Sequence, residues 1–265
     1  MKQFRILDPN LPDPGAHGLC ALAVMTKAPQ AGRVKTRLVP PLTPEEAAEL
    51  NKCFLRDTAA AISSVCGDGK TDFKTEAGAS HVEAATVARG IAVYTPIGAE
   101  SAYNDILPAD FSLLPQRGEQ FGERLYFAVM DLFDCGFESV CLIDSDSPTV
   151  PAKNFQQAVQ LLSMREDRVA LGPSDDGGYY LIGVKKPHGH LFDQIDWSTE
   201  RVLIQTMQRA TEMGLELKLL PTGYDVDDGV SLQRLRKELL ADTTPADAAP
   251  HTREFLASLV AREKL

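Results

Sequence analysis

The chain has 265 residues, of which 44% are hydrophobic and 24% are charged. These values are ordinary for a globular protein with one large or two small domains. The formal net charge of −10 argues against a general binder of nucleic acid or of anionic membranes, because both need a basic protein surface.

The cysteines and the amino terminus indicate a reducing compartment. Five cysteines are present, none at C-x-x-C spacing, which predicts reduced core thiols rather than a zinc site or a disulfide framework. No apolar run approaches the length of a membrane span, and residues 1–18 lack the apolar core of a signal peptide. We therefore expect a cytoplasmic protein without a membrane span.

A basic loop follows the first predicted strand. Residues 1–18 predict an irregular leader, and the apolar run from Leu19 to Met25 predicts a buried strand. In an open α/β sheet, ligands bind at the carboxyl ends of such strands. Pro29 and Gly32 fix the shape of the loop, although a solvated basic loop is the alternative interpretation. The loop matches neither a Walker A motif nor G-x-G-x-x-G, and its cations are Lys27, Arg33, Lys35 and Arg37.

The next part of the chain predicts helices and one further strand. Thr43 as cap, Pro44 and Glu46 form a helix start, and apolar spacing continues the helix to about Cys66. Residues 67–90 are weakly patterned, with a short helix conceivable around 81–88. The remaining elements are a strand over 91–95, a long connection over 97–112 and a helix ending near Cys135.

An acidic pair follows the central strand. Val140 to Ile143 predicts a buried strand, and Asp144 and Asp146 come directly after it. Residues two apart on a strand point to the same side, so both carboxylates suit a hard cation such as Mg²⁺ or Mn²⁺. An acidic turn that ends the strand at Ser147 and Pro148 is the alternative.

In the carboxyl-terminal half, acidic residues follow a predicted strand at two further places. A turn containing Asp175, Asp176, Gly177 and Gly178 separates strands over 168–171 and 179–184, and its glycines allow close backbone approach to a ligand. An ordinary hairpin needs the same residue types. Asp225 and Asp227 then follow a strand over 215–220. We expect helices over 151–164, 200–213 and 230–240, a linker over 241–250 and a terminal helix over 251–265.

Alternating strands and helices favour one doubly wound, Rossmann-like α/β domain over residues 19–240, followed by the linker and carboxyl-terminal helix. Its mostly parallel sheet would bring the basic loop and the acidic strand ends to one edge. Cations and a carboxylate-held Mg²⁺ can stabilise the negative charge of a departing diphosphate. The sequence thus predicts a nucleotide-diphosphate site.

Several motifs, in order, resemble the bacterial glycosyltransferase-A-like family associated with arsenosugar biosynthesis, within the nucleotide-diphospho-sugar transferase superfamily. The resemblance spans roughly residues 19–240 and implies a glycosyltransferase-A type of fold. The matching segments are KAPQAGRVKTRL from Lys27, SDSPT from Ser145, DDGGYYLIG from Asp175, WST from Trp197 and YDVD from Tyr224.

The resemblance implies roles for individual residues. Lys27, Lys35 and Arg37 would bind phosphates, Asp146 would be the principal metal ligand, and Asp227 the second. The family often has Gly at the position of Asp144, which here becomes a helper that contacts ribose or a metal-bound water. Among the residues beside the phosphate site, we assign Gly32, Gly177 and Gly178 to nucleotide binding, Lys35 also to catalysis, and Asp176 to the acceptor-side base.

The resulting hypothesis is a metal-dependent transferase that acts on a nucleotide-diphosphate sugar and an acceptor. The same superfamily hosts nucleotidylyltransferases, so transfer from a nucleoside triphosphate with release of pyrophosphate is an alternative. A non-catalytic nucleotide-binding protein is the third interpretation.

Overall fold

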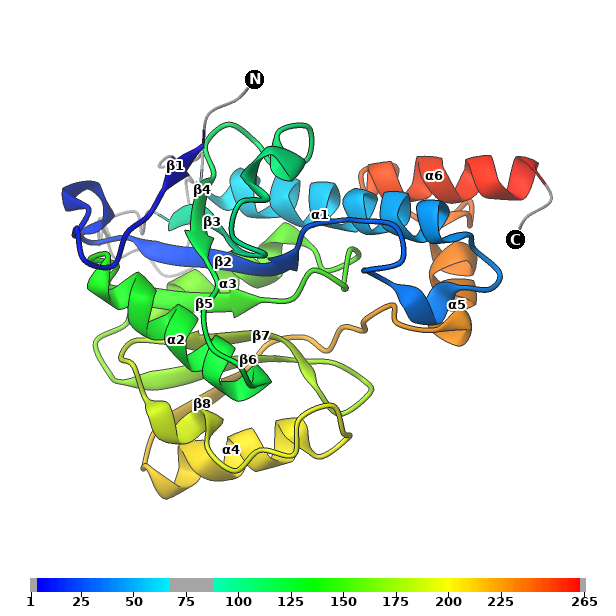
Figure 1. Ribbon diagram of the computed structural model, residues 1–265. Helices are drawn as coiled ribbons and strands as arrows, with labels where there is room; N and C mark the ends of the chain where they lie inside the picture. Colours follow the sequence, from blue (N-terminus) through cyan, green and yellow to red (C-terminus); the bar gives the residue numbers. More distant parts are fainter. Residues whose placement is uncertain (1–3, 67–87, 263–265) are drawn as a thin grey trace, which may run out of the picture.

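The computed structural model describes residues 4–66 and 88–262 and shows one eight-stranded sheet with helices on both faces (Figure 1). The strands are β1 (Arg5–Ile6), β2 (Cys20–Lys27), β3 (Ala88–Thr95), β4 (Ser112–Pro115), β5 (Ser139–Ile143), β6 (Arg168–Pro173), β7 (Tyr179–Val184) and β8 (Glu216–Leu219). The α-helices are α1 (Pro44–Cys66), α2 (Phe121–Asp134), α3 (Ala152–Ser163), α4 (Val202–Glu212), α5 (Gly229–Leu239) and α6 (Pro250–Ala261). The short helix considered around 81–88 lies almost wholly outside the described residues.

The strand order is β1-β4-β3-β2-β5-β7-β6-β8, and every strand runs in the same direction except β7. The predicted mostly parallel α/β sheet is thereby confirmed. The chain builds outward from β2 through β3 to β4 and then crosses to β5 on the other side of β2. This reversal creates a crevice at the carboxyl ends of β2 and β5, the position where open α/β sheets bind ligands.

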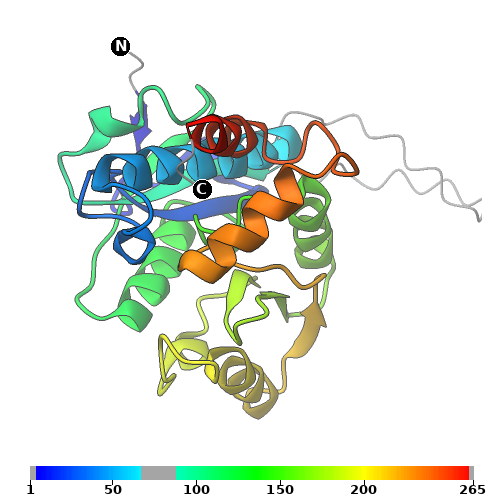
Figure 2. The same cartoon turned by 90° about the vertical axis from the view of Figure 1, so that its right-hand side faces the viewer.

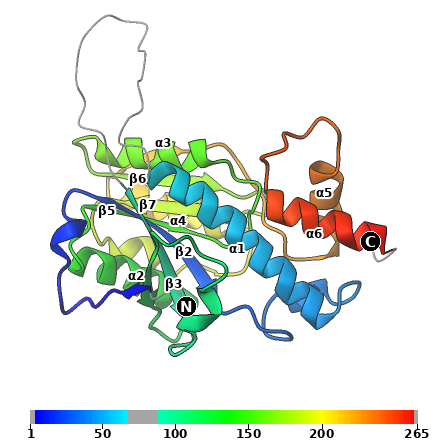
Figure 3. The ribbon, with the colours of Figure 1, turned by 90° about the horizontal axis from the view of Figure 1, so that it is seen from above.

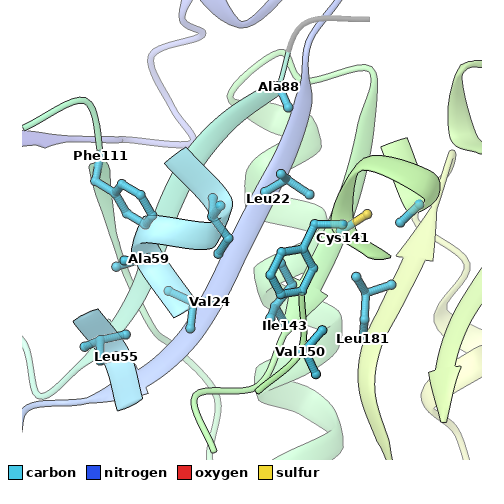
Figure 4. Packing of buried hydrophobic residues seen from close by; sticks show 14 of the residues in the cluster. Leu22, Val24, Leu55, Ala59, Ala88, Phe111, Cys141, Ile143, Val150 and Leu181 are labelled. Atoms are coloured by element: carbon cyan, nitrogen blue, oxygen red, sulfur yellow. The ribbon is translucent and has the colours of Figure 1, made fainter. Parts of the chain in front are cut away.

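Two hydrophobic clusters cover the two faces of the sheet. Helices α1 and α3 pack on one face, as Figure 4 shows for Leu55 and Ala59 against Leu22 and Val24. Helices α2 and α4 contribute to the cluster on the other face. Along β2, alternate residues belong to opposite clusters, so both faces of the strand are buried. This pattern explains why its sequence is a continuous apolar run.

A third cluster joins the carboxyl-terminal helices to the amino-terminal half of α1. Helix α6 lies beside α1 in Figures 2 and 3, and α5 lies next to α6. Buried leucines of both helices belong to the same hydrophobic cluster as Leu50 and Phe54 of α1. The carboxylate of Asp57 accepts hydrogen bonds from the backbone N–H groups of His251 at 3.0 Å and Thr252 at 2.9 Å. Asp57 thus satisfies donors at the start of α6, which fixes this helix on α1.

The observed elements differ from expectation mainly where they are short. Residues 4–18 are not wholly irregular, because β1 pairs with β4 and Leu7 and Asp13 are buried. The four-residue strand β4, at the end of the expected connection over 97–112, was not predicted, because a strand this short shows no readable periodicity. The capping box at α1 is observed: Thr43 Oγ1 accepts from Glu46 N, and Glu46 accepts from Thr43 N. None of the helices in the described ranges has the length and apolar character of a membrane span.

Candidate functional site

The basic loop after β2 is held in a defined conformation. Gly32 has a φ of 70°, and the space around its missing Cβ is open, so its role is conformational. Lys35 also has a positive φ, of 48°, at the start of the 3₁₀-helix Thr36–Leu38. Non-glycine residues with this backbone conformation concentrate at functional sites. The fully buried Leu38 anchors the loop in the third hydrophobic cluster.

Lys35 joins the two predicted metal ligands. Its Nζ lies 2.8 Å from Asp146 Oδ1, donates to Asp227 Oδ1 at 2.9 Å, and donates to the carbonyl of Val226 at 2.8 Å. These oxygens engage the whole donor capacity of the ammonium group. Burial would lower the pKa of Lys35, but Asp146 and Asp227 outweigh burial and raise it. Lys35 is therefore a permanent counter-ion between the two carboxylates.

Three further contacts fix the positions of Lys35 and its two carboxylate partners. Lys35 Nζ lies 5.5 Å from the ring centroid of the buried Phe54, within the range of a cation–π contact. Arg37 Nη2 donates to Asp227 Oδ2 at 2.7 Å, and the Arg37 side chain remains 74% exposed. Val226 N donates to the Asp146 carbonyl at 2.9 Å, which ties the loop after β8 to the end of β5.

Asp144 and Asp225 lie at the same sheet edge, and neither forms an ion pair with a residue that the structure describes. Ser147 Oγ donates to Asp144 Oδ2 at 2.7 Å. Burial, followed by the charge of Asp146, nevertheless raises the pKa of Asp144 well above the ordinary aspartate range. Burial also raises the pKa of Asp225, and the neighbouring Asp176 and Asp227 add to the effect. The site thus contains more carboxylates than its cations neutralise.

The acidic turn with two glycines connects the antiparallel strands β6 and β7. Its backbone is therefore that of an ordinary hairpin, which was the alternative interpretation of this motif. Asp176 Oδ1 accepts from Gly178 N at 2.8 Å, and Asp175 forms an ion pair with Arg234 on α5. Gly177 has a φ of 91°, and a Cβ there would lie 2.2 Å from the Glu200 carbonyl oxygen. Gly177 therefore permits close packing of the segment before α4.

Two pockets open at this edge. A pocket of about 290 Å³ is lined by the basic loop, including Lys27, Arg33 and Lys35. A larger pocket of about 720 Å³ extends over β7 and α4 and includes Asp144, Asp176 and Gly178. The two pockets share Arg37, Ser145, Asp146 and Asp227, so the Lys35 ion pairs form the boundary between them.

Most predicted site residues therefore come together. Lys27, Lys35, Arg37, Asp144, Asp146, Asp176, Gly178 and Asp227 line one or both pockets, whereas Gly32 shapes the basic loop and Gly177 packs against Glu200.

Sequence reasoning missed two contributors to this arrangement. Phe54 has the spacing of an ordinary core residue of a helix, so nothing in the sequence indicated that it contacts Lys35. Arg234 is one charge among several on α5 and carries no motif. Only the packing of α5 beside the β6–β7 turn brings Arg234 to Asp175.

The chain is similar to one protein family and to several solved structures. A protein-family model described as "Uncharacterized protein conserved in bacteria (DUF2064)" matches residues 79–199. No curated protein matches the sequence. The solved structure of a candidate nucleotide-diphospho-sugar transferase from Desulfovibrio desulfuricans G20 is 26% identical, with a TM-score of 0.74, and the match covers 94% of this chain and 98% of that chain.

A second solved structure is more distant. The 4-diphosphocytidyl-2C-methyl-D-erythritol synthase from Anaerococcus prevotii DSM 20548 is 12% identical, with a TM-score of 0.49, over 82% of this chain and 96% of that chain. The Desulfovibrio structure identifies the fold as that of the nucleotide-diphospho-sugar transferases and supports the predicted superfamily.

Proposed function

We propose that the protein is a transferase that binds the diphosphate of a nucleotide in the small basic pocket and uses a nucleotide-diphosphate sugar as donor. The observation that carries this proposal is the junction of the two pockets, where Lys35 neutralises Asp146 and Asp227 at the switch point between β2 and β5. The resemblance of several motifs to those of the arsenosugar-type glycosyltransferase family favours a sugar nucleotide as the donor.

The small pocket has free positive charge for phosphate oxygens. Among the described residues, Lys27 and Arg33 have no ion-pair or hydrogen-bond partner for their side chains, and both are exposed at the pocket wall. Arg33 can bind phosphate in a bidentate manner, whereas Lys27 acts as a point charge. Their charges would stabilise the nucleoside diphosphate as it leaves the sugar.

The acids at the boundary fit a Mg²⁺ or Mn²⁺ ion. No group of three or more His, Cys, Asp or Glu side chains suited to a metal occurs within residues 4–66 and 88–262. Mg²⁺ does not require such a cage, because it usually takes one or two carboxylates together with substrate phosphates and water. Asp146 Oδ1 and Asp227 Oδ1 both contact Lys35 Nζ, and both side chains are 34% exposed, so an ion held by these carboxylates would compete with the ammonium group for them. A bound ion would neutralise charge on the leaving diphosphate.

Asp176 is the proposed acceptor-side base, and Asp225 is the second acid that faces the same pocket. A base must lie near the acceptor and have a pKa close to the operating pH. Asp176 lines the large pocket and stays exposed, while its Oδ1 is held by Gly178 N. Asp225 is half-buried with a raised pKa. A normal rate in Asp176→Asn together with a large loss in Asp225→Asn would transfer the role to Asp225.

The deciding experiment is a calorimetric and thermal-shift panel of UDP, GDP, CDP, ADP and dTDP sugars and the matching triphosphates, with and without Mn²⁺. Asp146→Ala should abolish the metal-dependent part of nucleotide binding, whereas Asp193→Ala, an exposed acid away from the pockets, should leave it intact. Unchanged nucleotide affinity in Asp146→Ala would remove the metal assignment.

The products then distinguish the classes of reaction. Metal-dependent hydrolysis or transfer of the sugar supports the proposal, while release of pyrophosphate from a triphosphate supports nucleotidyl transfer. Stabilisation by nucleotides without any turnover would indicate a binding protein.

The roles of the two lysines can be separated in the same assay. Lys27→Ala should weaken binding of a nucleoside diphosphate roughly tenfold and leave binding of the nucleoside unchanged, because only a phosphate contact is lost. Lys35→Ala should also weaken diphosphate binding more than nucleoside binding, but with a loss of stability, because Asp146 and Asp227 lose their counter-ion. Equal losses for nucleoside and diphosphate in Lys27→Ala would place the phosphates elsewhere.

A further inference from the structure

The two pockets differ in charge. Lys27 and Arg33 leave the small pocket with unpaired positive charge. Eight acidic residues line the large pocket against two arginines, and both arginines are paired: Arg37 with Asp227, and Arg234 with Asp175. The described lining of the large pocket therefore offers no unpaired cation. An anion placed there would meet like charges at short range and in a partly desolvated setting.

The large pocket also has an apolar and aromatic side. The rings of Phe121 and Trp197 meet edge to face with centroids 5.1 Å apart. Phe121 is 54% exposed, and Val230, on the first turn of α5, is 80% exposed, so both present apolar surface to the pocket. A Cβ on Gly122 would lie 2.6 Å from Trp197 Nε1, so the absence of a side chain there lets the indole lie against α2. Such surfaces bind ligands with an apolar or aromatic face.

We propose, on the basis of the function proposed above, that the large pocket binds an acceptor that is neutral or cationic, bears a nucleophilic hydroxyl or amino group and has an apolar or aromatic face. Acceptors that carry a carboxylate or a phosphate are rejected. This selectivity also excludes a sugar phosphate as the acceptor, because its phosphate would enter the pocket that is lined by acids.

The transfer step follows from this division. The acceptor oxygen or nitrogen forms the new bond to the anomeric carbon of the sugar. The bond from that carbon to the diphosphate oxygen breaks, and its electron pair leaves with the nucleoside diphosphate in the small pocket. The proton of the acceptor passes to a carboxylate of the large pocket, for which Asp176 is the proposed base.

Trp197 provides a direct test because it is the only tryptophan in the chain. Its fluorescence can be titrated in the full-length protein with four probes of similar shape: benzyl alcohol, benzylamine, benzoate and benzyl phosphate. We expect saturable changes with the alcohol and the amine, and affinities roughly tenfold or more lower for the carboxylate and the phosphate. Equal affinity for benzyl alcohol and benzoate would overturn the proposal.

Two variants test whether charge causes the selectivity. Asp175→Asn removes one acid and releases Arg234, so it should raise the affinity for benzoate and leave that for benzyl alcohol nearly unchanged. Asp193→Asn removes an exposed acid outside the pocket and should change neither. An unchanged preference in Asp175→Asn, measured by the same titration, would contradict the electrostatic explanation.

The outcome can be separated from that of the proposed function by measuring nucleotide binding in parallel. Metal-dependent nucleotide binding combined with unselective probe binding would refute only the acceptor class. Selective probe binding without any nucleotide binding would refute the donor, and with it the role of the pocket as an acceptor site. Displacement of benzyl alcohol by a nucleoside monophosphate would show that the large pocket holds the nucleoside, which also overturns the proposal.

Discussion

Buried carboxylates are paired differently at the two edges of the sheet, the one formed by the amino ends of the strands and the one formed by their carboxyl ends. At the amino edge, Asp13 is 3% exposed and is satisfied by Arg89 Nη1 at 2.6 Å, Arg5 Nη1 at 3.0 Å and Gly15 N at 2.9 Å. At the carboxyl edge, Asp146 and Asp227 share the buried Lys35, Asp227 also pairs with Arg37, and Asp144 and Asp225 form no ion pair with any described residue. Asp13 therefore has two cationic partners, whereas two acids at the carboxyl edge, Asp144 and Asp225, form no ion pair within the described residues.

The pKa directions express this difference. Burial alone would raise the pKa of Asp13, but hydrogen bonds from Arg89 and Gly15 and the charges of Arg89 and Arg5 lower it. At the other edge, burial and neighbouring carboxylates raise the pKa of Asp144 and of Asp225. A saturated carboxylate stabilises the fold, whereas crowded carboxylates cost stability and leave capacity for a cation or a proton. The contrast agrees with the ligand site proposed at the carboxyl edge.

The largest expected effect is at Asp13. Asp13→Asn should lower the free energy of unfolding by about 3 kcal/mol at neutral pH, because Arg89 and Arg5 lose their buried ion-pair partner. The loss lies at the lower end for such pairs because both arginines can still reach water. Urea denaturation followed by circular dichroism would measure the loss. Asp8→Asn, at an exposed position in the same segment, should change stability by less than about 0.5 kcal/mol.

The pH dependence of this effect has a definite sign. The pKa of Asp13 is lowered in the folded state, so its stabilisation is present above the pKa of the unfolded chain and is lost as pH falls through the folded value. The difference between wild type and Asp13→Asn should therefore shrink in acid. A difference independent of pH would show that packing, not charge, makes Asp13 important.

An intermediate effect is expected at Lys35. Lys35→Met removes the counter-ion between Asp146 and Asp227 and should destabilise the protein by about 1–2 kcal/mol, discounted because both carboxylates are partly exposed. Mg²⁺ should restore part of the loss, since the ion supplies the missing positive charge. Thermal unfolding with and without Mg²⁺ measures both effects. Equal stabilisation of wild type and Lys35→Met by Mg²⁺ would show that the lysine and the metal do not share this position.

The comparison also shows which features the sequence could predict. The carboxyl edge was predictable because the basic loop and the Asp144 pair directly follow continuous apolar strands, as Asp144 follows Ile143. The amino edge was not, because Arg89 is far in sequence from Arg5 and Asp13, and none of the three belongs to a periodic pattern or motif. The same limit applies within the site. Lys35 was predicted to contact phosphate, but its contacts with Asp146 and Asp227 depend on how the loop after β8 packs on β5.

The smallest expected effect is at Asp144, and it has the opposite sign. Its pKa is raised in the folded state, so the folded protein binds more protons than the unfolded chain between the two pKa values, and stability falls as pH rises through that interval. Asp144→Asn keeps an acceptor for Ser147 Oγ and removes the charge, so it should stabilise the protein by about 1 kcal/mol at neutral pH. The gain should vanish in acid, where Asp144 is protonated in both states. Destabilisation at neutral pH would mean that Asp144 is held by a positive charge after all, and the contrast between the two edges would fail.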